Sequence, residues 1–347
     1  MNAPLTAMDT TAMPMRLTLD EARAYASRVL ETFGASPANA ATTAQALVAA
    51  EADGLGSHGL ARLPSYSAMV AAGKIDGYAT PASRRVAPSV LSVDAGNGFA
   101  YPAIEHALPL AEEIARETGI ALVSMRRSSH FGVAGQPVEK LAGRGLVALA
   151  FSNASASIAP WGGKKAVFGT NPLAFATPLR DRPPAVVDLS VAKVARGNVL
   201  AAAQRGEPIP EGWALDTEGR ATTDSRAGLA GTMVPMGEAK GTALAFLIEV
   251  MAAGLTASTF AFDTPSFFDG EGPPAAVGHV ILAIDPGRTA GAAYLDHMER
   301  LAATIEGEPG ARLPGQRRLA NREKAAREGV SVPPALRAAL AGMGFEG

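Results

Sequence analysis

Four short apolar runs constrain the fold of this chain more than any other feature. They read GIALVSM (119–125), GLVALAFSN (145–153), PAVVDLS (184–190) and VGHVILAIDP (277–286). Their apolar residues do not alternate with polar ones, which favours strands buried on both faces. Segments with helical patterns lie before, between and after them. We therefore expect an α/β protein with a central sheet and helical N- and C-terminal segments.

Two helices are predicted near the N-terminus from their end signals. Residues Thr18–Glu21 form a capping box, and the helix that they open is expected to run to Gly34. Ser36 followed by Pro37 is a typical start for a second helix. The Ala-rich segment that follows has no run of β-branched residues, so this helix is expected to reach about Asp53.

The stretch GLGSHG (54–59) matches the G-x-G-x-x-G pattern of a dinucleotide-binding turn. That turn works only where a strand precedes it and a helix follows it. Here a predicted helix precedes the motif, so we interpret the match as coincidence. Its glycines instead allow a tight turn after the helix, and this turn exposes Ser57 and His58.

Composition excludes several classes of function. The 347 residues allow a large core and two or more lobes, and 31 basic against 33 acidic residues give a net charge of −2. No basic run suggests a nucleic-acid or anionic-membrane partner. The absence of cysteine excludes disulfides and thiolate chemistry and fits the cytoplasm. The apolar stretch 241–262 carries Glu249 at its middle, so we interpret it as a buried helix rather than a membrane span.

Among the five histidines, two lie in glycine-flanked loops at the junctions of predicted elements. These are His58 and His130, whereas His106 and His297 fall on predicted helix surfaces and His279 falls in a strand. Functional residues concentrate in such loops, although a loop histidine that caps a backbone group remains the alternative. The histidines lack the spacing of metal ligands, so no metal is expected.

The segment after His58 places three chemically useful side chains on one face. If a helix begins just after His58, Arg62 lies in its first turn and Tyr66 one turn further on. A histidine delivers a proton, an arginine holds a carboxylate by two parallel hydrogen bonds, and Ser57 orients the imidazole. These roles suit reduction of a carbon–heteroatom double bond beside a carboxylate. An arginine that merely pairs with a surface acid is the alternative.

Six motifs then occur in a familiar order: GSHGLARLPSY, SSHFG, VFGTNPLAFATP, VVDLS, GEAKG and RLPGQRR. In this order they resemble the type-2 malate/L-lactate dehydrogenase family over about residues 18–325. Members of that family are NAD(P)-dependent oxidoreductases whose sheet is unlike the Rossmann fold. They include malate, lactate and sulfolactate dehydrogenases and the Δ1-piperideine-2-carboxylate/Δ1-pyrroline-2-carboxylate reductases.

The resemblance implies a division of the chain. It comprises a disordered tail over 1–15, an N-terminal helical segment over 16–89 that carries the catalytic serine and histidine, a central α/β cofactor-binding region over 90–285, and a C-terminal helical segment over 286–347 that returns to the N-terminal lobe.

The resemblance also implies residue roles. Ser57 and His58 correspond to the relay serine and proton donor, Arg62 to the substrate-carboxylate clamp, and His130 to an acid/base residue of some members. The further substrate-binding residues expected are Tyr66, from the helix geometry above, and Thr170, Arg196 and Gly197, from the resemblance. The expected cofactor-binding residues are His130, Phe131, Gly132, Val133, Ala134, Asp188, Leu189, Ser190, Ala239, Lys240, Arg312, Leu313, Pro314 and Gly315.

We therefore expect hydride transfer between a nicotinamide, with NADP(H) favoured over NAD(H), and the α-carbon of a small 2-oxo or 2-imino acid. The R-x-P-x-Y run (62–66), DAGNGFAYPA and FGTNPLAF favour a cyclic ketimine reductase. The alternatives are a dehydrogenase of malate, L-lactate or sulfolactate, and a catalytically silent nucleotide-binding scaffold. A cytoplasmic homodimer is expected, in which FFDGEGPP (267–274) is either a contact loop or simply an exposed loop.

Two departures from the family pattern concern the substrate and cofactor region. The chain reads DLSVAK after the third apolar run, so Val191 and Ala192 replace hydroxyl side chains of many members. The sequence MGEAKG precedes the helix of Lys240, where several members have two glycines. The exact substrate and the choice of cofactor are therefore left open.

Overall fold

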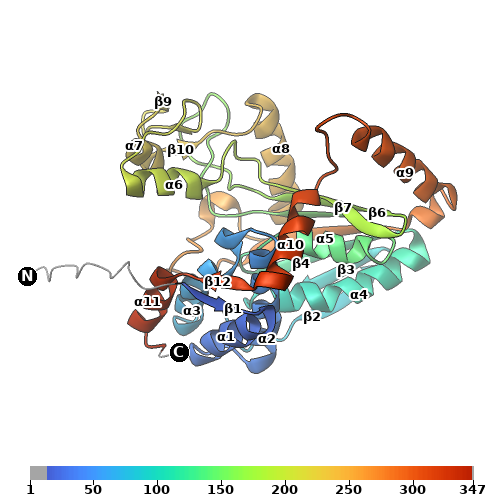
Figure 1. Ribbon diagram of the computed structural model, residues 1–347, viewed down its shortest axis with the longest axis horizontal. Coiled ribbons are helices and arrows are strands. Elements are labelled where there is room, and N and C mark those ends of the chain that lie inside the picture. The colour runs from blue at the N-terminus through green and yellow to red at the C-terminus, as the bar shows by residue number, and fades with distance from the viewer. Residues whose placement is uncertain (1–13, 346–347) are drawn as a thin grey trace, which may run out of the picture.

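A seven-stranded sheet forms the centre of the computed structural model, which describes residues 14–345 (Figure 1). Its strands, in spatial order, are β2 (Ala82–Ala87), β3 (Val90–Asp94), β4 (Ile120–Ser128), β11 (Val277–Ile284), β5 (Val147–Ser152), β6 (Leu173–Leu179) and β7 (Arg182–Leu189). The β3–β4 pair is parallel and the other pairs are antiparallel. This mixed order confirms the α/β class and differs from a parallel doubly wound sheet.

The four apolar runs form strands β4, β5, β7 and β11, as predicted. Most side chains of β5 and β11 are buried, as expected of strands covered on both faces, whereas in β7 only Val186 is buried. One core lies between the sheet and the helices α4 (Ala100–Thr118) and α5 (Gly135–Ala142). A second core lies on the other face, beneath α6 (Arg196–Arg205) and α8 (Ala239–Glu249).

The N-terminal helices confirm the predicted end signals. Helix α1 (Leu19–Thr32) begins with a complete capping box, in which the Thr18 hydroxyl and the Glu21 carboxylate each accept the other residue's backbone N–H. Helix α2 (Pro37–Ala52) begins after Ser36, whose hydroxyl accepts the N–H of Asn39 at 3.3 Å. Helix α3 (Leu63–Ala71) follows the GLGSHG turn.

The last part of the chain packs against the first. Helix α10 (Gln316–Glu328) leads into β12 (Val330–Val332), which pairs antiparallel with β1 (Met15–Leu17), and then into α11 (Pro334–Gly342) (Figure 1). Side chains from these C-terminal elements share a core with α1, α2 and α3. The predicted tail, 1–15, lies outside the described residues apart from its last two, and the predicted segment boundaries stay predictions.

The structure also corrects the sequence analysis. Strands β2 and β6 were not expected. A small sheet of β8 (Ala214–Leu215), β9 (Ala221–Thr222) and β10 (Thr232–Met233) was not expected either; it lies beside α6 and α7 (Ser225–Ala230). Helix α9 (Ala293–Glu306) follows β11 along the chain.

The prediction that the apolar stretch 241–262 is buried is wrong for one of its faces. Helix α8 ends at Glu249 and continues as a π-helical turn over Val250–Gly254. The exposed fractions of Phe246, Leu247 and Val250 are 63%, 47% and 41%. Within residues 14–345, no helix is both long enough and apolar enough to cross a membrane.

Four charged residues tie these parts together; we call them the Asp53 cluster: Asp53, Glu139, Arg318 and Arg322. Asp53 ends α2, Glu139 belongs to α5, and both arginines belong to α10. Arg322 donates to Asp53 Oδ2 at 3.0 Å and to Glu139 Oε1 at 2.8 Å. The Asp53 side chain is fully buried, and this burial raises its pKa although both arginines act to lower it. The cluster therefore connects the helix before the GLGSHG turn with the central region and the C-terminal segment.

We predict that Asp53→Ala lowers the free energy of unfolding by about 3 kcal/mol, because it leaves two partly buried guanidinium groups with Glu139 as their remaining carboxylate. Chemical denaturation monitored by circular dichroism measures this loss. The control is Asp20→Ala, which breaks an ion pair whose aspartate side chain is 92% exposed and should cost less than about 1 kcal/mol. Equal losses in the two variants would show that the cluster does not hold the lobes together.

Candidate active site

The GLGSHG turn places Ser57 and His58 between α2 and α3. The chain forms two short 3₁₀ turns, Gly56–His58 and Leu60–Arg62, before α3 begins at Leu63, so the α-helix starts later than predicted. Gly54 has a φ of +79°, which favours glycine. A Cβ on Gly59 would lie 2.2 Å from Glu51 Oε2, the atom that accepts the N–H of Leu60 at 3.0 Å. The glycines are therefore required by the turn itself.

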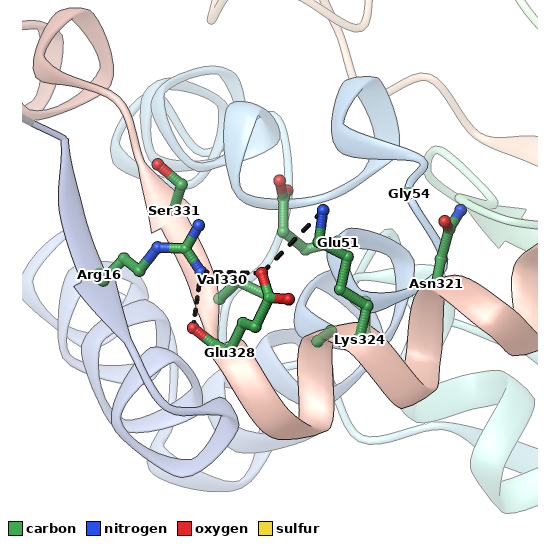
Figure 2. Close-up of a pocket in the computed structure, with 11 residues that line it drawn as sticks. Arg16, Glu51, Gly54, Asn321, Lys324, Glu328, Val330 and Ser331 are labelled. Carbon is green, nitrogen blue, oxygen red and sulfur yellow. Dashed lines mark hydrogen bonds and ion pairs between the residues drawn. The ribbon is translucent and has the colours of Figure 1, made fainter.

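A pocket of about 230 Å³ lies behind this turn (Figure 2). Glu51, Lys324 and Glu328 line it, together with residues of β12 and with Arg16, which bonds to Glu328. His58, Arg62 and His130 are not among its lining residues, so this pocket is distinct from the predicted substrate site.

The predicted carboxylate clamp is assembled around Ser57. The Ser57 hydroxyl lies 3.1 Å from His58 Nδ1, and Arg62 Nε donates to the backbone oxygen of Ser57 at 2.9 Å. Arg62 is 9% exposed, and its Nη1 is buried with no hydrogen-bond partner in the part of the chain that the structure describes. A buried guanidinium N–H without an acceptor is costly, so this atom marks a place for an anionic ligand.

The second predicted histidine meets the first. The rings of His58 and His130 stack with their centres 5.6 Å apart. His130 Nδ1 lies 2.7 Å from the Tyr66 hydroxyl, which lies 3.0 Å from the hydroxyl of Tyr101. Tyr66 therefore contacts His130, and its role in substrate binding stays a prediction. Tyr101 was missed, because it belongs to α4 and no motif marks it.

Burial and one positive charge determine the protonation of both imidazoles. Burial, reinforced by Arg62, lowers the pKa of His58 to about 4. Burial also lowers the pKa of His130 well below its ordinary value, followed by the effects of Arg62 and His58. Both rings are therefore neutral at pH 7. An anion bound to Arg62 would offset its charge and raise both pKa values.

Three predicted cofactor segments lie next to one another. Asp188, at the end of β7, accepts the N–H of Gly135 at 2.8 Å. The Pro314 oxygen accepts the N–H of Val186 at 3.3 Å, and Gly315 adopts a φ of +90° against the same strand. Burial raises the pKa of Asp188. The predicted residues of this group are Phe131, Gly132, Val133 and Ala134, then Asp188, Leu189 and Ser190, and finally Arg312, Leu313, Pro314 and Gly315.

The other predicted site residues make contacts of their own. Thr170 is fixed by its neighbour Asn171, whose amide donates to the buried Glu249 at 2.7 Å. Arg196 and Gly197 begin α6, and Arg196 donates to the Leu229 oxygen at 3.0 Å. Within residues 14–345, no hydrogen bond or ion pair joins these side chains, or those of Ala239 and Lys240, to His58, Arg62 or His130. Their roles stay predictions.

One departure from the family pattern lies at the start of α8. Ala239 and Lys240 form its first turn and are exposed. Glu238, which stands where several members have glycine, adopts a φ of +59°. A glutamate in this conformation is strained, whereas glycine is not.

No group of three or more His, Cys, Asp or Glu side chains that could hold a metal ion is found among the described residues.

A family model described as malate/L-lactate dehydrogenase matches residues 17–341. The chain belongs to the malate/L-lactate dehydrogenase family. This membership confirms the resemblance and identifies the chain as an oxidoreductase of that family.

Individual relatives differ in their named substrates. A (2R)-3-sulfolactate dehydrogenase (NADP(+)) from Chromohalobacter salexigens is 51% identical, over 93% of this chain and 96% of the relative. A Δ1-pyrroline-2-carboxylate/Δ1-piperideine-2-carboxylate reductase from Pseudomonas aeruginosa is 42% identical, over 93% and 97%. The crystal structure of Δ1-piperideine-2-carboxylate reductase from Pseudomonas syringae has a TM-score of 0.88 at 35% identity, over 95% and 99%.

We predict that His58 titrates near pH 4 in the protein free of substrate and cofactor. In the unfolded chain a histidine titrates at about 6.5, so the unfolded state binds more protons. This contribution to stability is therefore complete above about pH 6.5 and is lost as the pH falls toward 4. Arg62→Gln should raise the pKa of His58, because it removes the neighbouring charge. NMR titration of the imidazole signals, assigned with His58→Ala, measures both values; an unshifted His58 would contradict the prediction.

Proposed function

We propose that the protein catalyses the reversible reduction of a small 2-oxo acid or cyclic 2-imino acid at its α-carbon, with NADPH as the reductant. The observation that carries this proposal is the unpartnered Nη1 of Arg62, buried beside His58. An arginine fork next to a proton carrier suits a substrate whose carboxylate adjoins the reacting bond. In the reduction, a hydride joins the carbon, a proton joins the oxygen or nitrogen, and NADPH becomes NADP⁺.

The side chains divide the work as follows. Arg62 binds the carboxylate with its free nitrogen atoms, since Nε already donates to Ser57. The bound anion offsets the charge of Arg62, so His58 gains a proton more readily and gives it to the substrate heteroatom. Ser57, at 3.1 Å from Nδ1, orients the ring. His130 packs against His58 and is held by Tyr66.

The nicotinamide cofactor supplies the hydride when it is bound. Gly135, Asp188 and Gly315 come from three neighbouring segments, the first of which begins at His130, and this arrangement fits a nucleotide laid across them. Lys240, in the first turn of α8, offers a positive charge where a helix N-terminus also favours phosphate. We place NADP(H) ahead of NAD(H) because the 51% identical relative is named for NADP(+).

Among substrates, we place 3-sulfopyruvate, with (2R)-3-sulfolactate as its reduced form, ahead of the cyclic imines. The 51% identity to a (2R)-3-sulfolactate dehydrogenase exceeds the 42% identity to the imine reductase, and this revises the preference drawn from sequence motifs. The cyclic imines remain the second candidate. One observation supports them: the rings of Phe267 and Phe268 lie against His130 and Arg62, and these rings favour the apolar methylenes of a cyclic imine. We place the reaction in the cytoplasm, which fits the cysteine-free sequence.

We predict NADPH oxidation with 3-sulfopyruvate at a kcat/KM at least about tenfold above that with Δ1-pyrroline-2-carboxylate, pyruvate or oxaloacetate, and above that with NADH. Spectrophotometry at 340 nm with the purified protein measures these values. His58→Ala should lower kcat by about 10²- to 10⁴-fold while the Kd for NADPH is unchanged. Reversed preference would favour the imine reductase. Absence of turnover with every acid, despite NADPH binding, would favour a silent scaffold.

We also propose that the protein is a homodimer that buries the exposed face of α8 and the segment after it. This face comprises Phe246, Leu247, Val250, Leu255, Phe260 and Phe262. A contiguous apolar surface of this kind is unusual on a monomer and typical of a subunit interface.

We predict that Val250→Glu converts a dimer into a monomer, because it places a charge within the apolar face. Sedimentation velocity measures the change. The control is Leu301→Glu on α9, where a leucine that is 52% exposed lies outside that face. A wild-type protein that sediments as a monomer would contradict the proposal.

A further inference from the structure

A buried lysine outside the proposed chemistry holds a loop against the active site. Lys74 follows α3 and is 3% exposed. Its ammonium donates to the backbone oxygens of Ser266 at 2.7 Å, Glu271 at 2.6 Å and Asp269 at 3.2 Å. Burying an ammonium is costly unless its donors are satisfied, so these bonds fix the loop over 266–271 to the N-terminal lobe.

The loop is also organised internally and packed on α3. The hydroxyl of Ser266 accepts the N–H of Phe268 at 3.1 Å, and the carboxylate of Asp269 accepts the N–H of Glu271 at 3.0 Å. A Cβ on Gly270 would lie 2.8 Å from the backbone oxygen of Ala68 in α3. The loop therefore lies directly on the helix that follows Arg62.

This anchoring positions two aromatic rings on the predicted catalytic residues. Phe267 is 4% exposed, and its ring centre lies 5.4 Å from that of His130. The ring of Phe268 covers Arg62, with the guanidinium carbon 4.7 Å from the ring centre. Phe268 is itself 69% exposed, so burial in a core does not explain its place. Its contact is with the guanidinium.

We propose that Phe268 is a positioning residue for the carboxylate clamp and that Lys74 is the anchor that keeps it in place. The inference rests on the proposed function, in which Arg62 binds the substrate carboxylate. The ring restricts the guanidinium and shields one of its faces from water. An ion pair formed beside such a surface is stronger than one formed in water. Phe268 thus acts through Arg62 on substrate affinity rather than on proton transfer.

The test compares Phe268→Ala with Phe268→Tyr and with Tyr78→Ala. Tyr78 is a matched control, because it is also 69% exposed but lies in a turn of the N-terminal lobe away from Arg62. For each variant we would measure the Kd of oxamate, a carboxylate that resembles a 2-oxo acid, for the protein saturated with NADPH, by nucleotide fluorescence. The KM and kcat for the best substrate and the Kd of NADPH alone complete the set.

We expect Phe268→Ala to raise the Kd of oxamate and the KM by about tenfold, with a smaller effect on kcat and none on the Kd of NADPH. Phe268→Tyr should retain wild-type affinity, because it keeps the aromatic face, and Tyr78→Ala should have no effect. An unchanged oxamate affinity in Phe268→Ala, or an equal loss in Tyr78→Ala, would overturn the inference. So would a loss confined to kcat.

Two further variants complete the test. Lys74→Met should reproduce the loss seen in Phe268→Ala, since it releases the loop, and wild-type oxamate affinity in a folded Lys74→Met protein would overturn the role of Lys74 as anchor. Arg62→Lys separates the two proposals. If Arg62→Lys leaves oxamate affinity unchanged, the proposed function loses its carboxylate clamp. If Arg62→Lys weakens binding and Phe268→Ala does not, the inference about Phe268 alone fails.

Discussion

The Asp53 cluster is the constraint on which the site depends, because it fixes the GLGSHG turn relative to the central region. Asp53 lies four residues before Ser57, and Glu139 lies on the helix that follows the His130 loop. The two arginines of α10 join these carboxylates and come from the segment that also supplies Gly315. Burying such charges gains little net stability, since desolvation opposes attraction. The cluster instead fixes the relative positions of α2, α5 and α10. This arrangement brings His58 of the turn against His130 of the loop.

The position of these helices matters because His58 and His130 both lie near the positive charge of Arg62. Arg62 lowers the pKa of both His58 and His130, which adds to the effect of burial. Both rings are therefore neutral beside a guanidinium nitrogen that has no hydrogen-bond partner within residues 14–345. Binding of an anion has two effects: it supplies an acceptor to Arg62, and it lowers the free-energy cost of protonating a histidine. The acid would then be bound before His58 is fully charged, which couples substrate recognition to the protonation needed for reduction.

Secondary structure could be predicted from the sequence where it depends on residues close together in the chain. The capping box at Thr18, the Ser36–Pro37 helix start and the four apolar runs act over a few residues, and the structure confirms them. The tight turn at GLGSHG also follows from its own glycines. Other features depend on residues far apart in the chain. No periodic pattern in the sequence indicates them. They include the insertion of β11 between β4 and β5, the pairing of Asp53 with Arg322 across 269 residues, and the contact of Phe267 with His130. The exposure of one face of α8 also does not follow from the sequence, because composition does not distinguish buried apolar residues from exposed ones.

The residues of the proposed site come from two distant parts of the chain. Ser57, His58 and Arg62 come from one short turn, and these residues would define the reaction, namely proton delivery beside a carboxylate. The rings that face them come from Phe267 and Phe268, about two hundred positions later, on a loop that Lys74 and α3 hold against the N-terminal lobe. The turn can therefore stay the same while the loop changes. In the proposed function the turn therefore supplies the chemistry, and the loop over Arg62 bears on which acid fits.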